Sequence, residues 1–372
     1  MLKHKIVAII GTRPEAIKMA PILSLLKKDK NISLVTISTG QHKELLKPIF
    51  SLFKIKPDIE LDVMKKNQTL VDIQNNVLSK TYNELNKIKP DLLLVQGDTS
   101  TVLASSLAAF YLKIPIGHVE AGLRTHDMYN PFPEEANRVL VSNLSSIHFC
   151  PTKESKTNLE KENITKNLFI TGNTVIDSLL AVSKTIKSKP LSESKKILLT
   201  CHRRENFGAP LEAIFEAVLE IAKERKDITF VYPVHPNPNV KRLAQEKLSN
   251  VKNIELVEPL DYLDFIRAMK ESYLILTDSG GVQEEAPALG KPVLILRENT
   301  ERPEVIAYGV AKIVGYNKAK IKKEVYKLLD NKEYYKSMVK GRSPYGDGKS
   351  AQKIKKIVID FLDQRKDKLS AK

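Results

Sequence analysis

The 372-residue sequence predicts an α/β protein with two Rossmann-like domains, whose parallel sheets face a central cleft. Three observations predict this fold class. Short apolar runs alternate with longer segments of helical spacing along the whole chain, and the alternation restarts after a polar stretch at 183–194. In each half, a glycine-bearing turn follows an apolar run. Alternating strands and helices imply parallel sheets with right-handed crossovers, and the length allows each domain its own core.

Each predicted strand is a short apolar run bounded by polar or turn-forming residues. The predicted strands of the first half are 5–10, 33–38, 91–96, 115–120, 146–151 and 168–171. Those of the second half are 196–201, 228–233, 253–257, 273–277, 292–296 and 311–314. The predicted domains are 1–172 and 173–350, and the helical run 351–372 is expected to pack back on the first domain.

The composition excludes several classes of protein. The net charge of +16 arises from lysines spread along the chain among 44 acids, without the interleaved aromatic residues that stack bases, so nucleic-acid binding is not expected. No apolar run has the ~20 residues of a membrane span, and the amino-terminal run is too short for a signal peptide. Cys150 and Cys201 suit neither a disulfide framework nor a metal site. We expect a cytoplasmic protein without a membrane association.

Several catalytic signatures are missing from the sequence. It contains no G-x-G-x-x-G fingerprint, no P-loop and no G-x-S-x-G elbow. These absences argue against dehydrogenases, P-loop kinases and serine hydrolases.

The turn after the predicted strand 273–277 is the most informative part of the second half. It places Ser279, Gly280 and Gly281 at a helix N-terminus, where free N–H groups and the helix dipole favour a phosphate. Glu285 lies one helical turn further on, where its carboxylate can accept two hydrogen bonds from a ribose diol. These residues predict a nucleoside diphosphate site; the alternative is an ordinary capped helix after a buried strand.

A second turn of this kind follows the first predicted strand. Arg13 lies at the strand's carboxyl end, where open parallel sheets bind ligands, and its guanidinium suits phosphate oxygens. Pro14 fits the first turn of the helix that follows. The turn therefore predicts a second group that contacts phosphate.

Three carboxylates stand at strand ends or loop starts in the first half, namely Asp98, Glu120 and Glu134. Asp98 could instead cap a helix, and Glu134 could be a first-turn acid favoured by the helix dipole. Glu120 ends an apolar strand and therefore needs a partner. As a group they predict a carboxylate-lined cleft suited to proton transfer.

Two histidines of the second half also follow predicted strands. His202 stands beside Arg203 and would face a bound diphosphate, either as a contact or as a general acid for its departure. His235 lies between Pro233 and Pro236, where a structural role is equally well supported.

With these residues in place, the sequence resembles the non-hydrolysing UDP-N-acetylglucosamine 2-epimerases. The matching segments run in the family's order over nearly the whole chain. They are 11–18, 96–99, 117–124, 131–138, 172–174, 202–205, 232–235, 277–285, 300–304 and 344–348.

The resemblance implies a GT-B fold, usually a homodimer, that interconverts UDP-GlcNAc and UDP-ManNAc without an added cofactor, for cell-surface polysaccharide biosynthesis. A base removes the C2 proton while UDP leaves C1, giving 2-acetamidoglucal. UDP then adds again, and a proton returns to the opposite face of C2.

The resemblance also implies roles for individual residues. It assigns acid/base chemistry to Asp98, Glu120 and Glu134, with Arg138 in support, and the ribose to Glu285. The implied contacts to substrate and diphosphate are Arg13, Lys18, His202, Ser279, Gly280 and Arg302, and the implied uracil pocket is Leu260 and Phe265. Leu260 stands where some members have Gln, which weakens a side-chain contact there.

Bacterial members of the family can bind a second UDP-GlcNAc as an activator. Gln41, Glu134, Arg203 and His235 match that pocket, whereas Glu44 and Asn67 replace a Gln and an Arg. Because a cation is lost and an anion gained, we expect weak or absent activation.

Three other functions remain open at this level. A hydrolysing epimerase would release ManNAc and UDP, and a GT-B glycosyltransferase would use the same nucleotide site with an acceptor. A sensor of nucleotide sugars would not need the three carboxylates.

Overall fold

The computed structural model describes residues 4–41, 43–64, 67–187, 195–201, 203, 206–340 and 343–370, with side chains through residue 367. The chain forms two compact units. The first comprises Met1–Ser178 and Gly348–Lys372, and the second Leu179–Asp347. The sequence placed the boundary after residue 172, whereas the units divide within helix α7 (Thr174–Thr185).

The first unit is a parallel sheet with helices on both faces. Its strands are β1 (His4–Ile10), β2 (Ile32–Ser38), β3 (Ile59–Glu60), β4 (Leu92–Gln96), β5 (Ile116–Val119), β6 (Ile147–Cys150) and β7 (Leu168–Ile170). Its helices are α1 (Arg13–Lys27), α2 (Lys43–Phe53), α3 (Leu70–Ile88), α4 (Ser100–Tyr111), α5 (Glu134–Leu144), α6 (Lys153–Lys161), the start of α7, and α15 (Ser350–Ser370).

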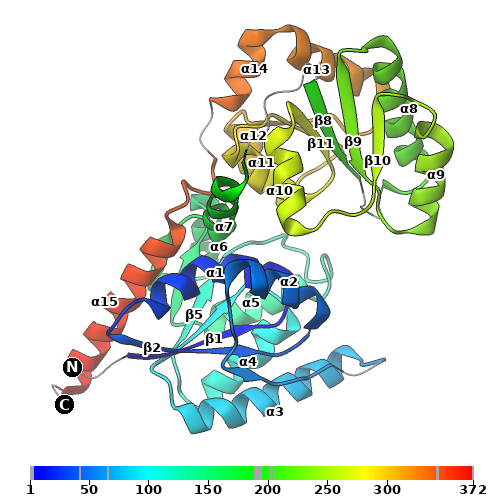
Figure 1. The fold of residues 1–372 in the computed structure, drawn as a ribbon. Coiled ribbons are helices and arrows are strands. Elements are labelled where there is room, and N and C mark those ends of the chain that lie inside the picture. The colour runs from blue at the N-terminus through cyan, green and yellow to red at the C-terminus, as the bar shows by residue number, and fades with distance from the viewer. Residues whose placement is uncertain are drawn as a thin grey trace. The chain divides into compact units, whose positions relative to one another are not determined.

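The strand order of this sheet is β3-β2-β1-β4-β5-β6-β7. Figure 1 shows α1 and α2 on one face of it, and α3 and α4 on the other. Because both faces are covered, β4 is buried along its whole length, as the uninterrupted apolar run Leu92–Val95 requires.

Helix α15 returns to the first unit, where it packs against α1. An ion pair from Lys355 Nζ to Asp29 Oδ2 and a hydrogen bond between His4 Nε2 and Asp363 Oδ1, both at 2.7 Å, fix it. Its first turn is capped by Asp177, whose carboxylate accepts hydrogen bonds from the main-chain N–H groups of Ser350 and Ala351. These contacts satisfy donors that a helix start leaves unpaired.

The second unit repeats this architecture. Its strands are β8 (Lys195–Thr200), β9 (Ile228–Pro233), β10 (Ile254–Val257), β11 (Leu274–Thr277), β12 (Val293–Ile295) and β13 (Ala311–Ile313). Its helices are α8 (Ala209–Glu224), α9 (Pro238–Leu248), α10 (Tyr262–Glu271), α11 (Gly280–Ala288), α12 (Pro303–Ala307), α13 (Lys318–Asp330), α14 (Lys332–Val339) and the end of α7. The parallel strand order is β10-β9-β8-β11-β12-β13.

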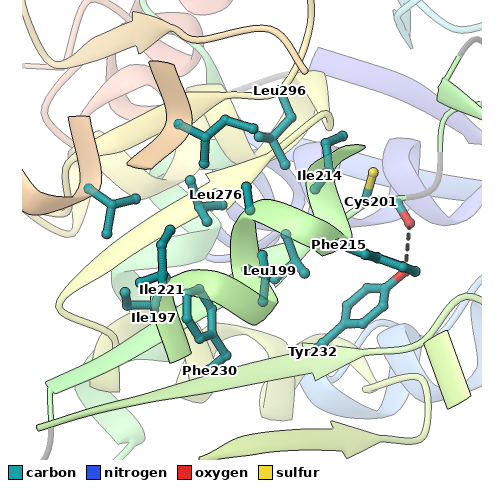
Figure 2. Packing of buried hydrophobic residues seen from close by; sticks show 14 of the residues in the cluster. Ile197, Leu199, Cys201, Ile214, Phe215, Ile221, Phe230, Tyr232, Leu276 and Leu296 are labelled. Atoms are coloured by element: carbon teal, nitrogen blue, oxygen red, sulfur yellow. Dashed lines mark hydrogen bonds between the residues drawn. The ribbon is translucent and has the colours of Figure 1, made fainter. Parts of the chain in front are cut away.

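The main core of the second unit lies between this sheet and helix α8 with its neighbours (Figure 2). Phe215 of α8 packs edge-on against Tyr232 of β9, with ring centroids 5.6 Å apart. The buried Tyr232 hydroxyl donates a hydrogen bond to the main-chain oxygen of Cys201, at 3.1 Å. A buried phenol needs such a partner, and this one fixes the chain just after β8.

The two parallel α/β sheets confirm the predicted fold class, and each predicted strand is present. Strand β3 was missed because its two residues are too short to show a pattern. None of the helices in the described part of the chain combines the length and apolar character that a membrane crossing needs.

Candidate functional site

Both sheets have the same order around their first strand, and this order locates the candidate sites. In each sheet the first strand lies next to the fourth, so that β1 pairs with β4 and β8 pairs with β11. Connections leave such a pair in opposite directions, which opens a crevice at the strands' carboxyl ends where ligands bind. Of the predicted site residues, Arg13, Asp98 and Gly280 lie in the turns or helix starts directly after these strands, and others follow neighbouring strands.

Glu15 joins the two turns at the crevice of the first unit. Its buried carboxylate accepts hydrogen bonds from Gly11 N at 2.6 Å, from Thr12 Oγ1 at 2.9 Å and from Thr99 Oγ1 at 2.8 Å. Burial raises the pKa of Glu15 to about 7, although these hydrogen bonds oppose the rise. The turns approach so closely that a Cβ on Gly11 would lie 2.4 Å from Thr101 Oγ1, which explains the glycine.

Glu120 ends the neighbouring strand β5 and is buried among donors. Lys18 Nζ lies 2.6 Å from each of its carboxylate oxygens. Gln96 Nε2 donates to Oε2, and Asn173 Nδ2 donates to Oε1 at 2.9 Å. Its φ of 66° is left-handed, a strained conformation that is common at functional sites.

Asp98 is held by residues of helix α5. Arg138 Nη2 contacts Asp98 Oδ2 at 2.6 Å, and Arg138 Nη1 lies 3.0 Å from Glu135 Oε2. Asn137 Nδ2 donates to the main-chain oxygen of Asp98 at 2.8 Å. The structure therefore brings Asp98 and Arg138 together, and adds the buried Glu135, which fixes the guanidinium from its other side.

Arg13 and Glu134 differ from these anchored groups. Arg13 is the exposed first residue of α1, and Glu134 is the half-buried first residue of α5. Within the described residues, neither side chain has a hydrogen bond or an ion pair. Both are therefore free to contact a ligand without first leaving a protein partner.

The candidates for a second ligand site lie in both units. Gln41 Oε1 accepts a hydrogen bond from Thr101 Oγ1 at 2.7 Å in the first unit. Arg203 and His235 belong to the second unit, where His235 Nδ1 accepts a hydrogen bond from Asn237 N at 3.2 Å. Their role in activation stays a prediction.

In the second unit, buried Asp278 connects the ends of β8 and β11. Its Oδ2 accepts hydrogen bonds from the main-chain N of Arg203 at 2.9 Å and from Asn206 Nδ2 at 3.0 Å. The same amide of Asn206 donates to Leu296 O at 3.1 Å, after β12. Asp278 and Asn206 thus connect the ends of three strands.

Gly280 begins α11 in the middle of a group of charged side chains. A Cβ at this residue would lie 3.6 Å from Arg203 Nη2 and 3.9 Å from Arg302 Nη2. Arg302 is oriented by the buried Glu284, which accepts a hydrogen bond from its Nε. A helix N-terminus between two guanidiniums is well suited to a diphosphate.

The other predicted residues of the second unit lie on α11 or near α10. Ser279 is the N-cap of α11 and Gly281 its exposed second residue, whereas Glu285 is buried one turn further on. Leu260 and Phe265 are half-buried, and Phe265 lies in the first turn of α10. His202 lies outside the described residues.

Sequence reasoning missed several partners of these residues. Gln96 and Asn173 stood in the quoted segments without an assigned role, and Glu15, Glu135, Glu284 and Glu301 received none either. Each of these four acids is within three residues of a predicted site residue in the sequence. This closeness in sequence was the signal that could have identified them as partners of the site residues.

Comparison with known proteins shows the family of the chain. The family model described as UDP-N-acetylglucosamine 2-epimerase matches residues 24–359. The UDP-N-acetylglucosamine 2-epimerase of Campylobacter jejuni is 49% identical over 372 aligned positions, covering 95% of this chain and 97% of that protein. The Bacillus subtilis enzyme of the same name is 45% identical and covers 99% and 98%, respectively.

A solved structure shows the same similarity in three dimensions. The UDP-GlcNAc 2-epimerase of Neisseria meningitidis, described as bound to UDP-GlcNAc, has a TM-score of 0.87 and 46% identity, covering 96% of this chain and 100% of that one. A match of this extent in sequence and fold, together with the family model, shows that the chain belongs to the UDP-N-acetylglucosamine 2-epimerase family.

Proposed function

We propose that this chain interconverts UDP-N-acetylglucosamine and UDP-N-acetylmannosamine, without hydrolysing either. The observation that carries the proposal is the carboxylate group at the strand ends of the first unit. There Asp98 and Glu120 are each held by a cation, and Glu134 lies at the start of α5. A glycosyl transfer needs fewer acid/base groups than this.

The proposed reaction exchanges one proton and one C–O bond in each direction. A carboxylate removes the C2 proton, and the C1–O bond to UDP breaks with its electron pair on the UDP oxygen. The resulting 2-acetamidoglucal carries a C1–C2 double bond. The same UDP oxygen adds to C1, and a second acid delivers a proton to the opposite face of C2. The sequence of steps is redox-neutral, so it consumes no oxidant, reductant or added cofactor.

The first unit supplies the proton-transfer groups in this proposal. Glu134, which has no partner among the described residues, is the group best prepared to exchange a proton. Lys18 contacts both carboxylate oxygens of Glu120 and so fixes the orientation of that group. Asp98 keeps a fixed orientation through Arg138.

The second unit supplies the binding of UDP. Gly280, Ser279, Arg302 and His202 contact the diphosphate, and Glu285 accepts hydrogen bonds from the ribose. Leu260 and Phe265 flank the uracil. The name of the Neisseria relative supports this choice of nucleotide sugar, since it is described as bound to UDP-GlcNAc. A homodimer is also proposed, and light scattering would test it.

The deciding experiment is proton NMR of the protein with UDP-GlcNAc in D₂O. The proposal predicts UDP-ManNAc with deuterium at C2, and deuterium entering the remaining UDP-GlcNAc. Free ManNAc with UDP would show a hydrolysing epimerase instead. An unchanged spectrum would reject epimerisation and turn attention to a transferase that needs an acceptor.

A further inference from the structure

The charged group at the start of α11 contains an anion as well as cations. Arg203 and Arg302 point their guanidinium groups at Gly280, as described above. Glu301 Oε2 lies 3.8 Å from the position that a Cβ on Gly280 would take. A carboxylate therefore already lies where the arginines and the helix N-terminus converge.

Glu301 is surrounded by three guanidinium groups. Its Oε1 is 3.6 Å from Arg203 Nη1, and its Oε2 is 3.9 Å from Arg302 Nη1. Arg297 makes closer contacts, with Nη1 and Nη2 each 3.2 Å from a carboxylate oxygen. Burial raises the pKa of Glu301, but the hydrogen bond from Arg297 and the charges of Arg203 and Arg302 outweigh it, so the pKa lies below its ordinary value. The side chain is thus an anion at neutral pH.

Glu301 is held less firmly than the other acids of this region. Asp278 and Glu284 are buried, and each is tied by hydrogen bonds that shape the strand ends or Arg302. The Glu301 side chain is 36% exposed, and its contacts with Arg203 and Arg302 are too long for hydrogen bonds. It can therefore leave these two arginines while it keeps its bond to Arg297.

From this geometry we infer that Glu301 is an internal substitute for the diphosphate. Its carboxylate pairs with Arg203 and Arg302 until a nucleoside diphosphate binds and displaces it from them. The inference rests on the proposed function and deepens it, because it names a residue that sets the affinity of the same site. In the free protein, the carboxylate reduces the repulsion between Arg203 and Arg302. In the complex it stays bonded to Arg297, and from there it repels the bound phosphates as a like charge, which weakens binding.

The test is calorimetric titration of UDP and of uridine into three forms of the full chain. Glu301→Gln removes the charge while an amide oxygen can still accept a hydrogen bond from Arg297. Glu298→Gln removes the same charge from an exposed glutamate of the same loop and serves as the matched control. We expect Glu301→Gln to lower the Kd for UDP about tenfold and to leave the Kd for uridine unchanged, since uridine has no phosphate. The control should change the UDP affinity about twofold at most, because exposed charges are screened.

Other outcomes would overturn the inference. If Glu301→Gln binds UDP as the unsubstituted chain does, or more weakly, Glu301 is a structural partner of the arginines. If it tightens uridine and UDP alike, the effect does not arise at the diphosphate. If the unsubstituted chain binds uridine and UDP equally weakly, the proposed UDP site itself is wrong, and the inference falls with it.

Discussion

The carboxyl ends of β1 and β4 in the first unit, and of β8 and β11 in the second, hold the same position in the same strand order. The side chains that they carry differ. The first crevice gathers Glu15, Asp98 and Glu120, whereas guanidinium groups surround Gly280 in the second. The difference teaches that strand order decides where a ligand can bind, while a few side chains after the strands decide what is bound. The following predictions separate the two roles.

The largest expected effect is that of Glu120→Gln in the first unit. We expect kcat to fall about 1000-fold, because the variant loses an acid/base group. We also expect the unit to lose about 3 kcal/mol of stability, since the largely buried pair of Glu120 with Lys18 is broken. Activity assays and urea unfolding would measure the two losses.

The control for this variant is Glu162→Gln. Glu162 pairs with the buried Arg124 in the same unit, at 2.7 Å, and has no predicted catalytic role. The Glu162→Gln variant should be less stable than the unsubstituted chain, and it should keep its activity below its unfolding temperature. Equal activity losses in the two variants would show that Glu120 acts only through folding.

Glu134→Gln should reduce kcat about 100-fold without a change in stability. The reason is that Glu134 has no hydrogen bond or ion pair among the described residues, so folding does not depend on its charge. Loss of deuterium exchange at C2, with unchanged calorimetric binding of UDP, is the measurement.

Glu154→Gln provides a matched control, because Glu154 also lies in the first turn of a helix, α6. It should retain full activity. A Glu134 variant that exchanges deuterium at the normal rate would remove Glu134 from the proton-transfer step.

Arg203→Gln tests the second unit and should raise the Kd for UDP about tenfold, through loss of one guanidinium beside Gly280. The fold should be preserved, because Arg203 binds Asp278 through its main-chain N–H and not through its side chain. Calorimetry with UDP and uridine would measure the effect. Arg242→Gln on α9, which loses an exposed pair with Glu246, should bind UDP normally.

The smallest expected effect concerns Glu15 and appears as a pH dependence of stability. The folded pKa of Glu15 is about 7 and its ordinary value is 4.5. Between these values only the unfolded form ionises, so the stability that Glu15 contributes is full below 4.5 and is lost as pH rises to 7. Glu15→Gln cannot titrate, and its amide can both accept from Gly11 and donate to the threonine hydroxyls.

The measurement is the melting temperature of both forms from pH 4 to pH 8. The melting temperature of the unsubstituted chain should fall by a few degrees relative to that of Glu15→Gln as pH rises, and the difference should be constant above about pH 7. Parallel curves for the two forms would contradict a raised pKa at Glu15.

Much of the fold was predictable from the sequence, for reasons that the structure makes clear. Strands such as β1 and β4 are buried on both faces, so they appear as continuous apolar runs with sharp ends. Turns with Gly11 or Gly280 follow β1 and β11, and strand ends of parallel sheets lie together. The pattern therefore predicted which strand ends would carry the candidate site.

The partners of the site residues were not predictable in the same way. The contact of Glu120 with Asn173 joins residues 53 positions apart, and a single sequence gives no sign of such a pairing. Glu301 precedes Arg302 directly, but adjacency does not show that its carboxylate reaches Arg203 and Arg297 as well. Side-chain direction after a strand end depends on the turn geometry, which local pattern does not determine.

The return of α15 to the first unit has a consequence for how the protein is made. The second unit is continuous in sequence, so all of its residues are synthesised before those of α15. The first unit lacks the helix that covers α1 until residues 350–370 emerge from the ribosome. During translation the half that was made first is therefore the last to be completed.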